Sequence, residues 1–221
     1  MDTFGIIQDA DLWLRATFPD VPRETWERLD AFEALLRAES ESQNLISRGT
    51  FDHIRLRHFA DSAQLLRFDP DSASASAWLD LGSGAGFPGL IVGALSHHRL
   101  TLVESRRLRI DFLSRAAGLL GISGRTEVIG SPVERVPASK FDIISARAFA
   151  PLDRLLSLAH RFSTENTIWI LPKGRSAQSE LEQVRDAWQG DFRLEPSLTD
   201  PEARIIVAKG VQPRPRRRER P

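Results

Sequence analysis

The stretch Leu79-Asp80-Leu81-Gly82-Ser83-Gly84-Ala85-Gly86-Phe87-Pro88-Gly89 indicates the type of fold. An apolar run from Ala77 to Leu81 predicts a buried strand, and it leads directly into a loop with glycine at every second position. Residues from about Phe87 to Leu95 are rich in Ala, Leu, Ile and Val and predict a helix. A strand, a glycine turn and a helix in this order are typical of the corner that binds a phosphate or a cofactor in an open α/β sheet.

Two features of this loop favour one class of ligand. Gly82, Gly84 and Gly86 are followed by Phe87, where a dinucleotide-binding loop has Gly or Ala. Asp80 precedes the first glycine by two residues, and a carboxylate there repels a phosphate but attracts an ammonium group. S-adenosylmethionine (SAM) carries a methionine ammonium, so SAM fits this loop better than NAD. A structural turn without a ligand remains the alternative.

The composition of the 221-residue chain excludes several classes of protein. Hydrophobic residues make up 41%, which is enough for one substantial domain. The chain has no cysteine, so we expect no disulfide, no thiolate metal site and no cysteine nucleophile. There is no run of about 18 apolar residues that would suggest a membrane span. Asp2, Asp9 and Asp11 are unlike a signal peptide, and we expect a soluble, cytoplasmic protein.

The formal net charge is zero, but the charge is unevenly distributed. Residues 214–221 hold five Arg and one Glu and so carry +4, which leaves about −4 for the rest of the chain. This balance argues against a protein that binds nucleic acid over its whole surface, although it allows a local basic patch.

The hydrophobic pattern divides the chain into a helical cap and an α/β domain. Apolar residues recur at helical spacing through residues 1–70, which predicts a helical N-terminal cap. Residues 71–212 alternate strands with helices and predict a SAM-binding, Rossmann-like, mostly parallel seven-strand sheet with a C-terminal antiparallel strand. The Pro- and Arg-rich residues 213–221 are expected to be disordered. The expected strands are 77–81, 100–104, 126–129, 141–145, 167–171, 192–196 and 203–209, and the expected helices of the domain are 87–95, 106–121, 152–162 and 176–188.

Acidic and small residues follow the carboxyl ends of the expected strands, where open α/β sheets bind their ligands. Glu104 ends the second strand, and a carboxylate there can accept hydrogen bonds from both ribose hydroxyls. A surface glutamate is the alternative. The loop from Gly130 to Glu134 follows the third strand and can line an adenine with its backbone and Val133, although such loops are common without a ligand.

The segment Ser145-Ala146-Arg147-Ala148-Phe149-Ala150 follows the fourth strand, where SAM-dependent enzymes usually place residues that face the methyl acceptor. It lacks the Asn/Asp-Pro-Pro-aromatic motif of enzymes that methylate exocyclic amines, and methylation at pyrimidine C5 normally needs a cysteine nucleophile. Acceptors that are already nucleophilic remain, such as guanine N7, for which catalysis is mostly alignment. We assign the catalytic role to Arg147, which can hydrogen-bond guanine O6, a phosphate or the cofactor carboxylate. A structural salt bridge is the alternative.

Basic residues gather at the same rim of the expected sheet. They can form a local basic mouth for RNA, although a charged cluster on a helix is more often solvated surface. The His97-His98 pair lies at the opposite end of the sheet, and no cluster of His and carboxylate residues predicts a metal site. The expected RNA-binding residues are Arg106, Arg107, Arg109, Lys173 and Arg175.

Eight short motifs run in order through the chain: Asn44-Leu45-Ile46-Ser47; Arg57-His58-Phe59-Ala60-Asp61-Ser62; the stretch from Asp80 to Gly89; Glu104-Ser105; Phe112-Leu113; Val133-Glu134; the segment from Ser145 to Ala150; and Lys173-Gly174. Together they resemble the ribosomal RNA small subunit methyltransferase G family, also called glucose-inhibited division protein B. The motifs around His58 and Arg147 are the most specific. Glu104 stands where some relatives have Asp, and Leu108 stands where Lys or Arg is frequent.

The resemblance implies a class I SAM-dependent enzyme that methylates N7 of a guanine in the decoding-region loop of bacterial 16S rRNA. It also implies cofactor contacts at Gly82, Phe87, Val133, Glu134 and Arg147. The expected partner is 16S rRNA or the small ribosomal subunit, and we expect a monomer with no membrane or metal partner. The alternatives are methylation of a small molecule or protein, a non-catalytic SAM-binding factor on the ribosome and, more remotely, an NAD oxidoreductase.

Overall fold

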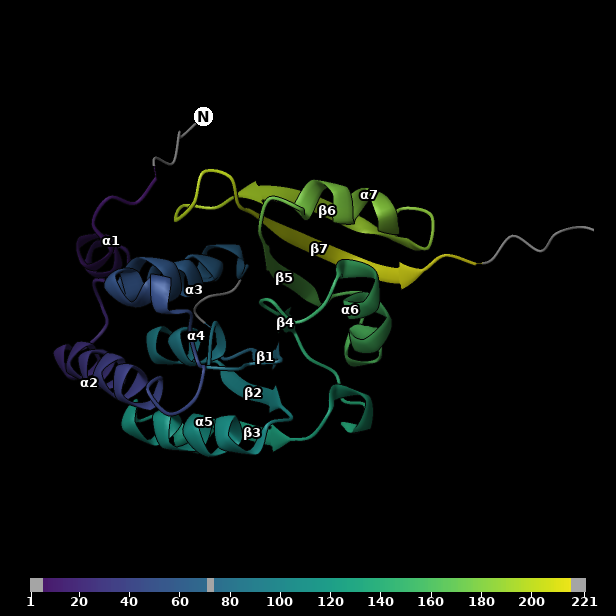
Figure 1. The fold of residues 1–221 in the computed structure, drawn as a ribbon. Coiled ribbons are helices and arrows are strands. Elements are labelled where there is room, and N and C mark those ends of the chain that lie inside the picture. The colour runs from purple at the N-terminus through teal and green to yellow at the C-terminus, as the bar shows by residue number, and fades with distance from the viewer. Residues whose placement is uncertain (1–5, 71–73, 216–221) are drawn as a thin grey trace, which may run out of the picture.

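The computed structural model describes residues 6–70 and 74–215, which fold around one seven-stranded sheet (Figure 1). The strands are β1 (Ala77–Leu81), β2 (Arg99–Glu104), β3 (Thr126–Gly130), β4 (Ile143–Ser145), β5 (Ile168–Lys173), β6 (Trp188–Pro196) and β7 (Arg204–Pro213). Their order is β3-β2-β1-β4-β5-β7-β6, and β1 pairs in parallel with both β2 and β4. Among these strands β7 alone runs in the opposite direction, so it pairs antiparallel with both β5 and β6. The predicted fold class is therefore confirmed, and the order reverses beside β1, where such sheets bind ligands.

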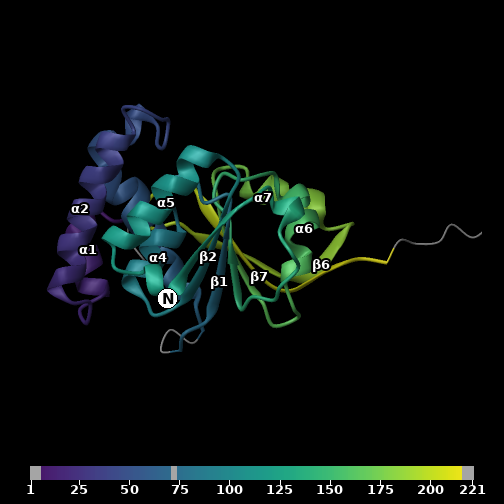
Figure 2. The same ribbon diagram turned by 90° about the horizontal axis from the view of Figure 1, so that it is seen from below.

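Helices cover both faces of the sheet (Figure 2). The helices α1, α2, α4 and α5 share a hydrophobic core with one face, and α6 and α7 share a second core with the other. The helices are α1 (Ala10–Thr17), α2 (Arg23–Glu39), α3 (Asp61–Ala63), α4 (Gly89–Leu95), α5 (Arg107–Leu119), α6 (Leu152–Ala159) and α7 (Ala177–Val184). Short helical turns are η1 (Arg48–His53), η2 (Arg55–Ala60), η3 (Gln64–Phe68), η4 (Ser123–Arg125), η5 (Val133–Arg135) and η6 (His160–Phe162).

The C-terminal part of the sheet is longer than the sequence indicates. The helix expected over residues 176–188 ends at Val184, because Trp188 already pairs with Pro213 of β7. The backbone amide of Arg214 also donates a hydrogen bond, at 2.8 Å, to the turn before β6. The first residues of the predicted tail are therefore ordered at the end of β7, and the rest of that prediction falls on residues 216–221, outside the described residues.

The N-terminal helices pack on the predicted ligand loop through aromatic side chains. Phe32 of α2 is fully buried, and its ring centroid lies 5.7 Å from that of Phe59, 5.9 Å from that of Phe87 and 6.2 Å from that of Phe112. Phe87 belongs to the glycine stretch, so this cluster ties the cap to the loop. The division into a cap of residues 1–70 and a domain of residues 71–212 stays a prediction.

Gln64 joins the cap to the loop between β6 and β7. Its side chain is buried, and its amide oxygen accepts a hydrogen bond from the Leu198 amide at 2.8 Å. Its NH₂ group donates to an Asp61 oxygen at 3.0 Å, and to the hydroxyls of Ser197 at 3.2 Å and Thr199 at 3.4 Å. One side chain thus holds together segments more than 130 residues apart, as the Gln64–Ser197 separation of 133 shows.

We expect Gln64→Leu to lower the free energy of unfolding by about 3 kcal/mol, because it leaves several buried polar groups without a partner. In a chain of this size that corresponds to a melting temperature about 6–12 °C lower. Thermal and urea unfolding measure the change. Gln178→Leu, at an exposed position on α7, is the matched control. Equal stability of the two variants would show that this buried network contributes little.

Candidate active site

The glycine loop after β1 has a backbone that only glycine adopts without strain. Gly82, Gly84 and Gly86 have φ values of 67°, 58° and 89°. A Cβ atom on Gly82 would lie 2.4 Å from the ring of Phe149, and one on Gly86 would lie 2.2 Å from Leu90. The backbone conformation therefore favours glycine at all three positions, and space also requires it at Gly82 and Gly86.

Glu104, the last residue of β2, fixes the glycine loop by accepting a hydrogen bond from its backbone. It is 6% exposed; its Oε2 accepts from the Gly84 amide at 3.1 Å, and its Oε1 accepts from the amides of Ser105 at 2.7 Å and Arg106 at 2.9 Å. Two acceptor sites on Oε1 are thus filled, whereas Oε2 keeps a lone pair. That lone pair is available to a hydroxyl in the adjoining cavity.

A cavity of about 350 Å³ opens between the glycine loop and the loops after β3 and β4. We call it the glycine-loop cavity, and its volume is in the range of small-molecule sites. Gly82, Glu104 and Val133 line it; Glu104 has its one free lone pair there, and the side chain of Val133 is buried and apolar. These residues fit the nucleoside part of SAM. The lining is Gly82, Val103, Glu104, Ser105, Arg106, Arg109, Ser131, Pro132, Val133, Glu134, Ala148, Phe149, Ala150, Arg154 and Leu158.

Asp80 lies beneath the loop and lines neither this cavity nor the next one described below. Its carboxylate is fully buried; Oδ1 accepts from the Ser145 hydroxyl at 2.8 Å, and Oδ2 accepts from the Gly89 amide at 3.4 Å. The Ser145 hydroxyl in turn accepts from the Trp78 indole N–H at 2.8 Å. The carboxylate therefore ties the loop to α4 and β4, and its contact with a cofactor ammonium stays a prediction.

Burial raises the pKa of Asp80 from 3.8 to about 6, although the hydrogen bonds from Ser145, Ser83 and Gly89 act in the opposite direction. A carboxyl with a raised folded-state pKa binds more protons in the folded state, so stability falls as pH rises. We expect its contribution to be complete below pH 3.8 and lost as pH passes 6, a change of about 3 kcal/mol. Urea unfolding of Asp80→Asn, in the same buffers as wild type, isolates this change. A stability difference independent of pH would mean that Asp80 does not titrate in this range.

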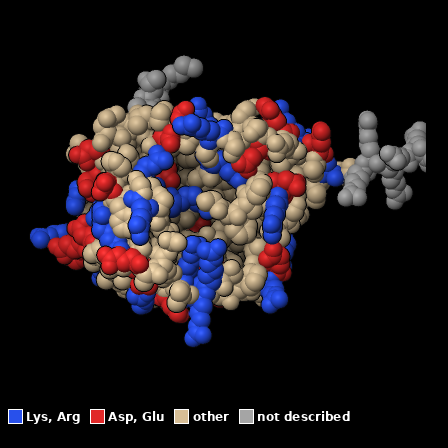
Figure 3. Space-filling view, viewed as in Figure 1, with Lys and Arg blue, Asp and Glu red and all other residues tan. Residues whose placement is uncertain are grey.

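A second, larger cavity of about 820 Å³ lies between the cap and the ends of β4, β5 and β7; we call it the Arg147 cavity. Figure 3 shows a hollow on this face of the molecule with basic side chains around it. Ala148, Phe149 and Ala150 line both cavities, so this short segment is the wall between them. Ala148 has a φ of 52°, which is uncommon for a residue with a side chain. The Arg147 cavity is also lined by Leu45, Ile46, Ser47, Thr50, Arg57, His58, Asp61, Arg147, Lys173, Glu180, Ser197, Thr199 and Arg204.

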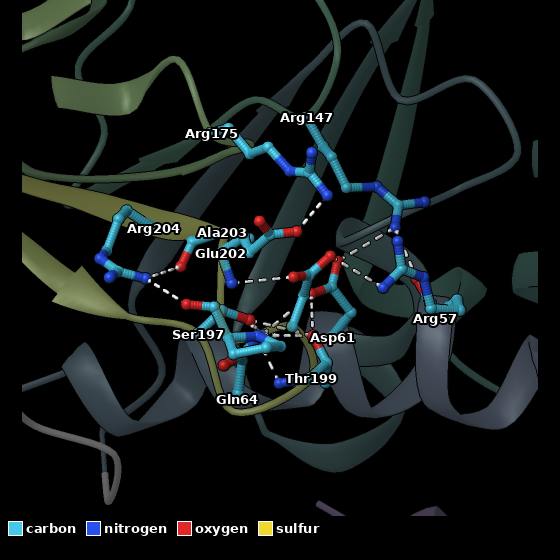
Figure 4. A network of polar contacts seen from close by, with 12 residues as sticks. Arg57, Asp61, Gln64, Arg147, Arg175, Ser197, Thr199, Glu202, Ala203 and Arg204 are labelled. Carbon is cyan, nitrogen blue, oxygen red and sulfur yellow. Dashed lines mark hydrogen bonds and ion pairs between the residues drawn. The ribbon is translucent and has the colours of Figure 1, made fainter. Parts of the chain in front are cut away.

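Arg147 is anchored by the cap. Its Nη1 donates to Asp61 Oδ2 and to the backbone oxygen of Arg57, both at 3.3 Å (Figure 4). Its Nη2 lies 3.2 Å from His58 Nδ1. Its guanidinium carbon lies 5.1 Å from the centre of the Phe87 ring. The salt bridge considered from the sequence is therefore present, and its partner is 86 residues away in the chain.

Asp61 is itself held in place from the opposite wall. Its Oδ1 accepts from the Thr199 hydroxyl at 2.7 Å, in addition to the bond from Gln64 (Figure 4). Arg57 forms its ion pair with Asp200 at 3.0 Å. The contacts of Thr199 and Gln64 with Asp61 could not be predicted, because no local pattern gives a signal for either.

The predicted RNA-binding residues fall into two groups. Lys173 is largely buried, donating to the Ala150 carbonyl at 2.9 Å and to Glu180 at 2.8 Å, and Arg175 pairs with Glu202. Arg106 and Arg107 are exposed and form no ion pair within residues 6–70 and 74–215. Arg109 donates to the Asn44 carbonyl at 3.1 Å and lies 3.8 Å from Glu104. Of the five predicted residues, Arg106 and Arg107, at the start of α5, are therefore those whose positive charges have no ion-pair partner among the described residues. Contact of all five residues with RNA stays a prediction.

In the part of the chain that the structure describes, no three His, Cys, Asp or Glu side chains come together as a metal site would require. Within the same residues, no helix has the length and apolarity needed to cross a membrane. His98 is buried with its Nε2 3.1 Å from Asp69 Oδ2, as part of the core below the sheet.

Comparison with known proteins agrees with this geometry. Residues 25–200 match the family model described as rRNA small subunit methyltransferase G. Proteins named ribosomal RNA small subunit methyltransferase G from Rhizorhabdus wittichii and Zymomonas mobilis are 54% and 49% identical; the first alignment covers 94% of both chains, the second 94% of this chain and 95% of the relative.

Solved structures of other methyltransferases share the fold. A SAM-dependent methyltransferase of Methanococcus maripaludis aligns with a TM-score of 0.54 at 12% identity, over 73% of this chain and 90% of that one. A ribosomal protein L11 methylase of Lactobacillus delbrueckii aligns with a TM-score of 0.53 at 15% identity, over 75% and 80%. The fold is that of SAM-dependent methyltransferases, and the chain belongs to the ribosomal RNA small subunit methyltransferase G family.

Proposed function

We propose that this protein transfers the methyl group of SAM to N7 of a guanine in the decoding-region loop of 16S rRNA. The observation that carries the proposal is the arrangement of two adjoining cavities with a common wall at residues 148–150. One cavity suits a nucleoside with ribose hydroxyls, and the other is larger and contains an anchored arginine. We also propose that the protein acts as a cytoplasmic monomer on rRNA or on the small ribosomal subunit.

For this methyl transfer, the main task of the protein is to align the methyl group with guanine N7. When bound, SAM supplies an electrophilic methyl group on its sulfonium. Guanine N7 has a free lone pair at neutral pH, so no residue needs to remove a proton, and the absence of cysteine is no obstacle. Positioning two reactants in this way lowers the barrier substantially.

We assign the roles as follows. Glu104 accepts a hydrogen bond from one ribose hydroxyl with the lone pair that Oε2 keeps, and the glycine loop lets the cofactor approach the backbone closely. Arg147 donates to guanine O6 or to a neighbouring acceptor with the N–H groups that its anchors leave free. The full proposed sets are the cofactor-binding residues Asp80, Gly82, Gly84, Gly86, Phe87, Glu104, Val133, Glu134 and Arg147, and the RNA-binding residues Arg106, Arg107, Arg109, Lys173 and Arg175.

The test uses the purified protein, methyl-labelled SAM, and 16S rRNA or small subunits. We expect labelled rRNA, with the methyl group mapped to guanine N7 by nuclease digestion and mass spectrometry. Label on another atom would overturn the acceptor assignment. Methylation of a small molecule or protein without RNA would favour the alternative substrate, and tight SAM binding without transfer would favour a non-catalytic factor.

A further inference from the structure

His58 lies in the wall of the Arg147 cavity, on the turn η2, and contacts Arg147 directly. Its side chain is buried, and its ring stacks on Phe87, with centroids 5.0 Å apart and an angle of 18° between the planes. Its two ring nitrogens point to different partners. Nδ1 lies 3.2 Å from Arg147 Nη2, and Nε2 lies 3.0 Å from Thr50 Oγ1.

The partner on each side determines where the imidazole proton resides. Arginine has donors only, so Nδ1 must accept from Arg147 and carries no proton. On the other side, the Thr50 hydroxyl donates its own proton to the Ser47 carbonyl at 2.7 Å, so Thr50 Oγ1 has a lone pair to offer to His58. Nε2 must then be the donor. The Thr50 side requires a proton on Nε2, and the Arg147 side requires none on Nδ1; together they specify a neutral imidazole with its proton on Nε2.

The charges around the ring agree with this assignment. Burial, reinforced by the positive charges of Arg147 and Arg57, lowers the pKa of His58 to about 3. An imidazolium would also direct an N–H at the Arg147 guanidinium, which cannot accept it.

We infer that His58 is a positioning residue that holds Arg147 toward the acceptor cavity through an unprotonated Nδ1. Through Nε2 and Thr50 it also fixes the segment Leu45–Ser47, which lines the same cavity. The relay from the Ser47 carbonyl through Thr50 and His58 to Arg147 thus joins one wall of the cavity to the group proposed to orient the guanine. Its effect on turnover rests on the proposed function, whereas the protonation pattern does not.

The first test reads the protonation pattern without any substrate. Nitrogen-15 NMR of the full-length protein at neutral pH distinguishes protonated from unprotonated ring nitrogens, and the spectrum of a His58 variant identifies which of the five histidine signals is His58. We expect a proton on Nε2 and none on Nδ1. A proton on Nδ1, in either the other tautomer or the imidazolium, would overturn the inference.

The second test separates the two nitrogens by substitution. The amide of Asn occupies a place near Nδ1 and can still accept from Arg147, whereas the amide of Gln occupies a place near Nε2 and can reach only Thr50. We therefore expect His58→Gln to lower kcat about 10- to 100-fold, because the bond to a charged group is lost. His58→Asn should remain at least about tenfold more active than His58→Gln.

His97→Gln is the matched control, because the same replacement there is at an exposed position in the loop between α4 and β2. Circular dichroism and melting temperature establish that all three variants fold. If His58→Asn and His58→Gln lose activity equally, or if His58→Gln matches wild type, Nδ1 does not position Arg147. If the wild type methylates no guanine N7 at all, the proposed function fails, and the NMR result still decides the protonation pattern.

Discussion

Replacing Arg147 with alanine should lower the rate of rRNA methylation about 100-fold or more, because hydrogen bonds to a charged group contribute about 1.5–3 kcal/mol each. The guanidinium has three anchors on the cap, so its remaining N–H groups have a defined direction in the cavity. Catalysis by alignment depends on such fixed donors. Single-turnover transfer of labelled methyl to small subunits, at saturating SAM, measures the effect.

Two further variants test whether the loss of activity is specific to the guanidinium of Arg147. Arg147→Lys keeps the positive charge but loses the planar fork, so we expect it to recover only a small part of the activity. Arg185→Ala removes an exposed arginine beyond α7 and should leave the rate unchanged. If Arg147→Ala turned over at the wild-type rate, Arg147 would have no catalytic role, and its salt bridge with Asp61 would be structural.

Replacing Glu104 with glutamine should weaken SAM binding about 100-fold. The carboxylate accepts three backbone N–H groups and keeps one lone pair for the ribose. A glutamine of the same shape must turn an NH₂ group toward donors or toward the ribose hydroxyl, and each lost bond to a charged acceptor costs about 1.5–3 kcal/mol. Isothermal titration with SAM measures the affinity directly.

Glu127→Gln is the matched control for Glu104, because Glu127 is exposed on β3, the strand that pairs with β2. It should bind SAM as wild type does. A melting temperature for Glu104→Gln is needed as well, since the same carboxylate organises the glycine loop. Unchanged affinity of a folded Glu104→Gln would remove Glu104 from the cofactor site.

The sequence could predict which residues gather at the site, because a parallel sheet brings the carboxyl ends of its strands to one edge. The glycine stretch identified β1 and its loop, and alternation of strands with helices then placed Glu104, Val133 and Arg147 at the same edge. The structure has all three at the two adjoining cavities. Local pattern and topology were sufficient for this part of the site.

Partners that come from distant segments could not be predicted in this way. His58 and Arg147 are 89 residues apart, and nothing in either segment specifies the contact. The hydrogen bond of Asp80 to Ser145, on the neighbouring strand β4, likewise has no signal in the sequence, although it places the carboxylate beneath the loop. Both are outcomes of tertiary packing.

The helix predicted over residues 176–188 shows a further limit of pattern reading. Leu181, Val184 and Trp188 repeat at helical spacing, and all three are buried. The spacing is correct for α7, but Trp188 reaches the same core from a strand, because β7 offers hydrogen bonds at that point. Tertiary pairing overrides a helical period at its end.

The link between the cap and the loop of β6 and β7 has a consequence for the order in which the sites assemble. The residues that line the glycine-loop cavity lie between Gly82 and Leu158, within the middle of the chain. The Arg147 cavity instead depends on the contacts of Asp61 and Gln64 with Thr199, which is 138 residues from Asp61 and 135 from Gln64. Contacts between such distant segments form late in folding, since the intervening chain must first be ordered. During biosynthesis, all residues that line the glycine-loop cavity are therefore synthesised before Thr199, on which the Arg147 cavity depends.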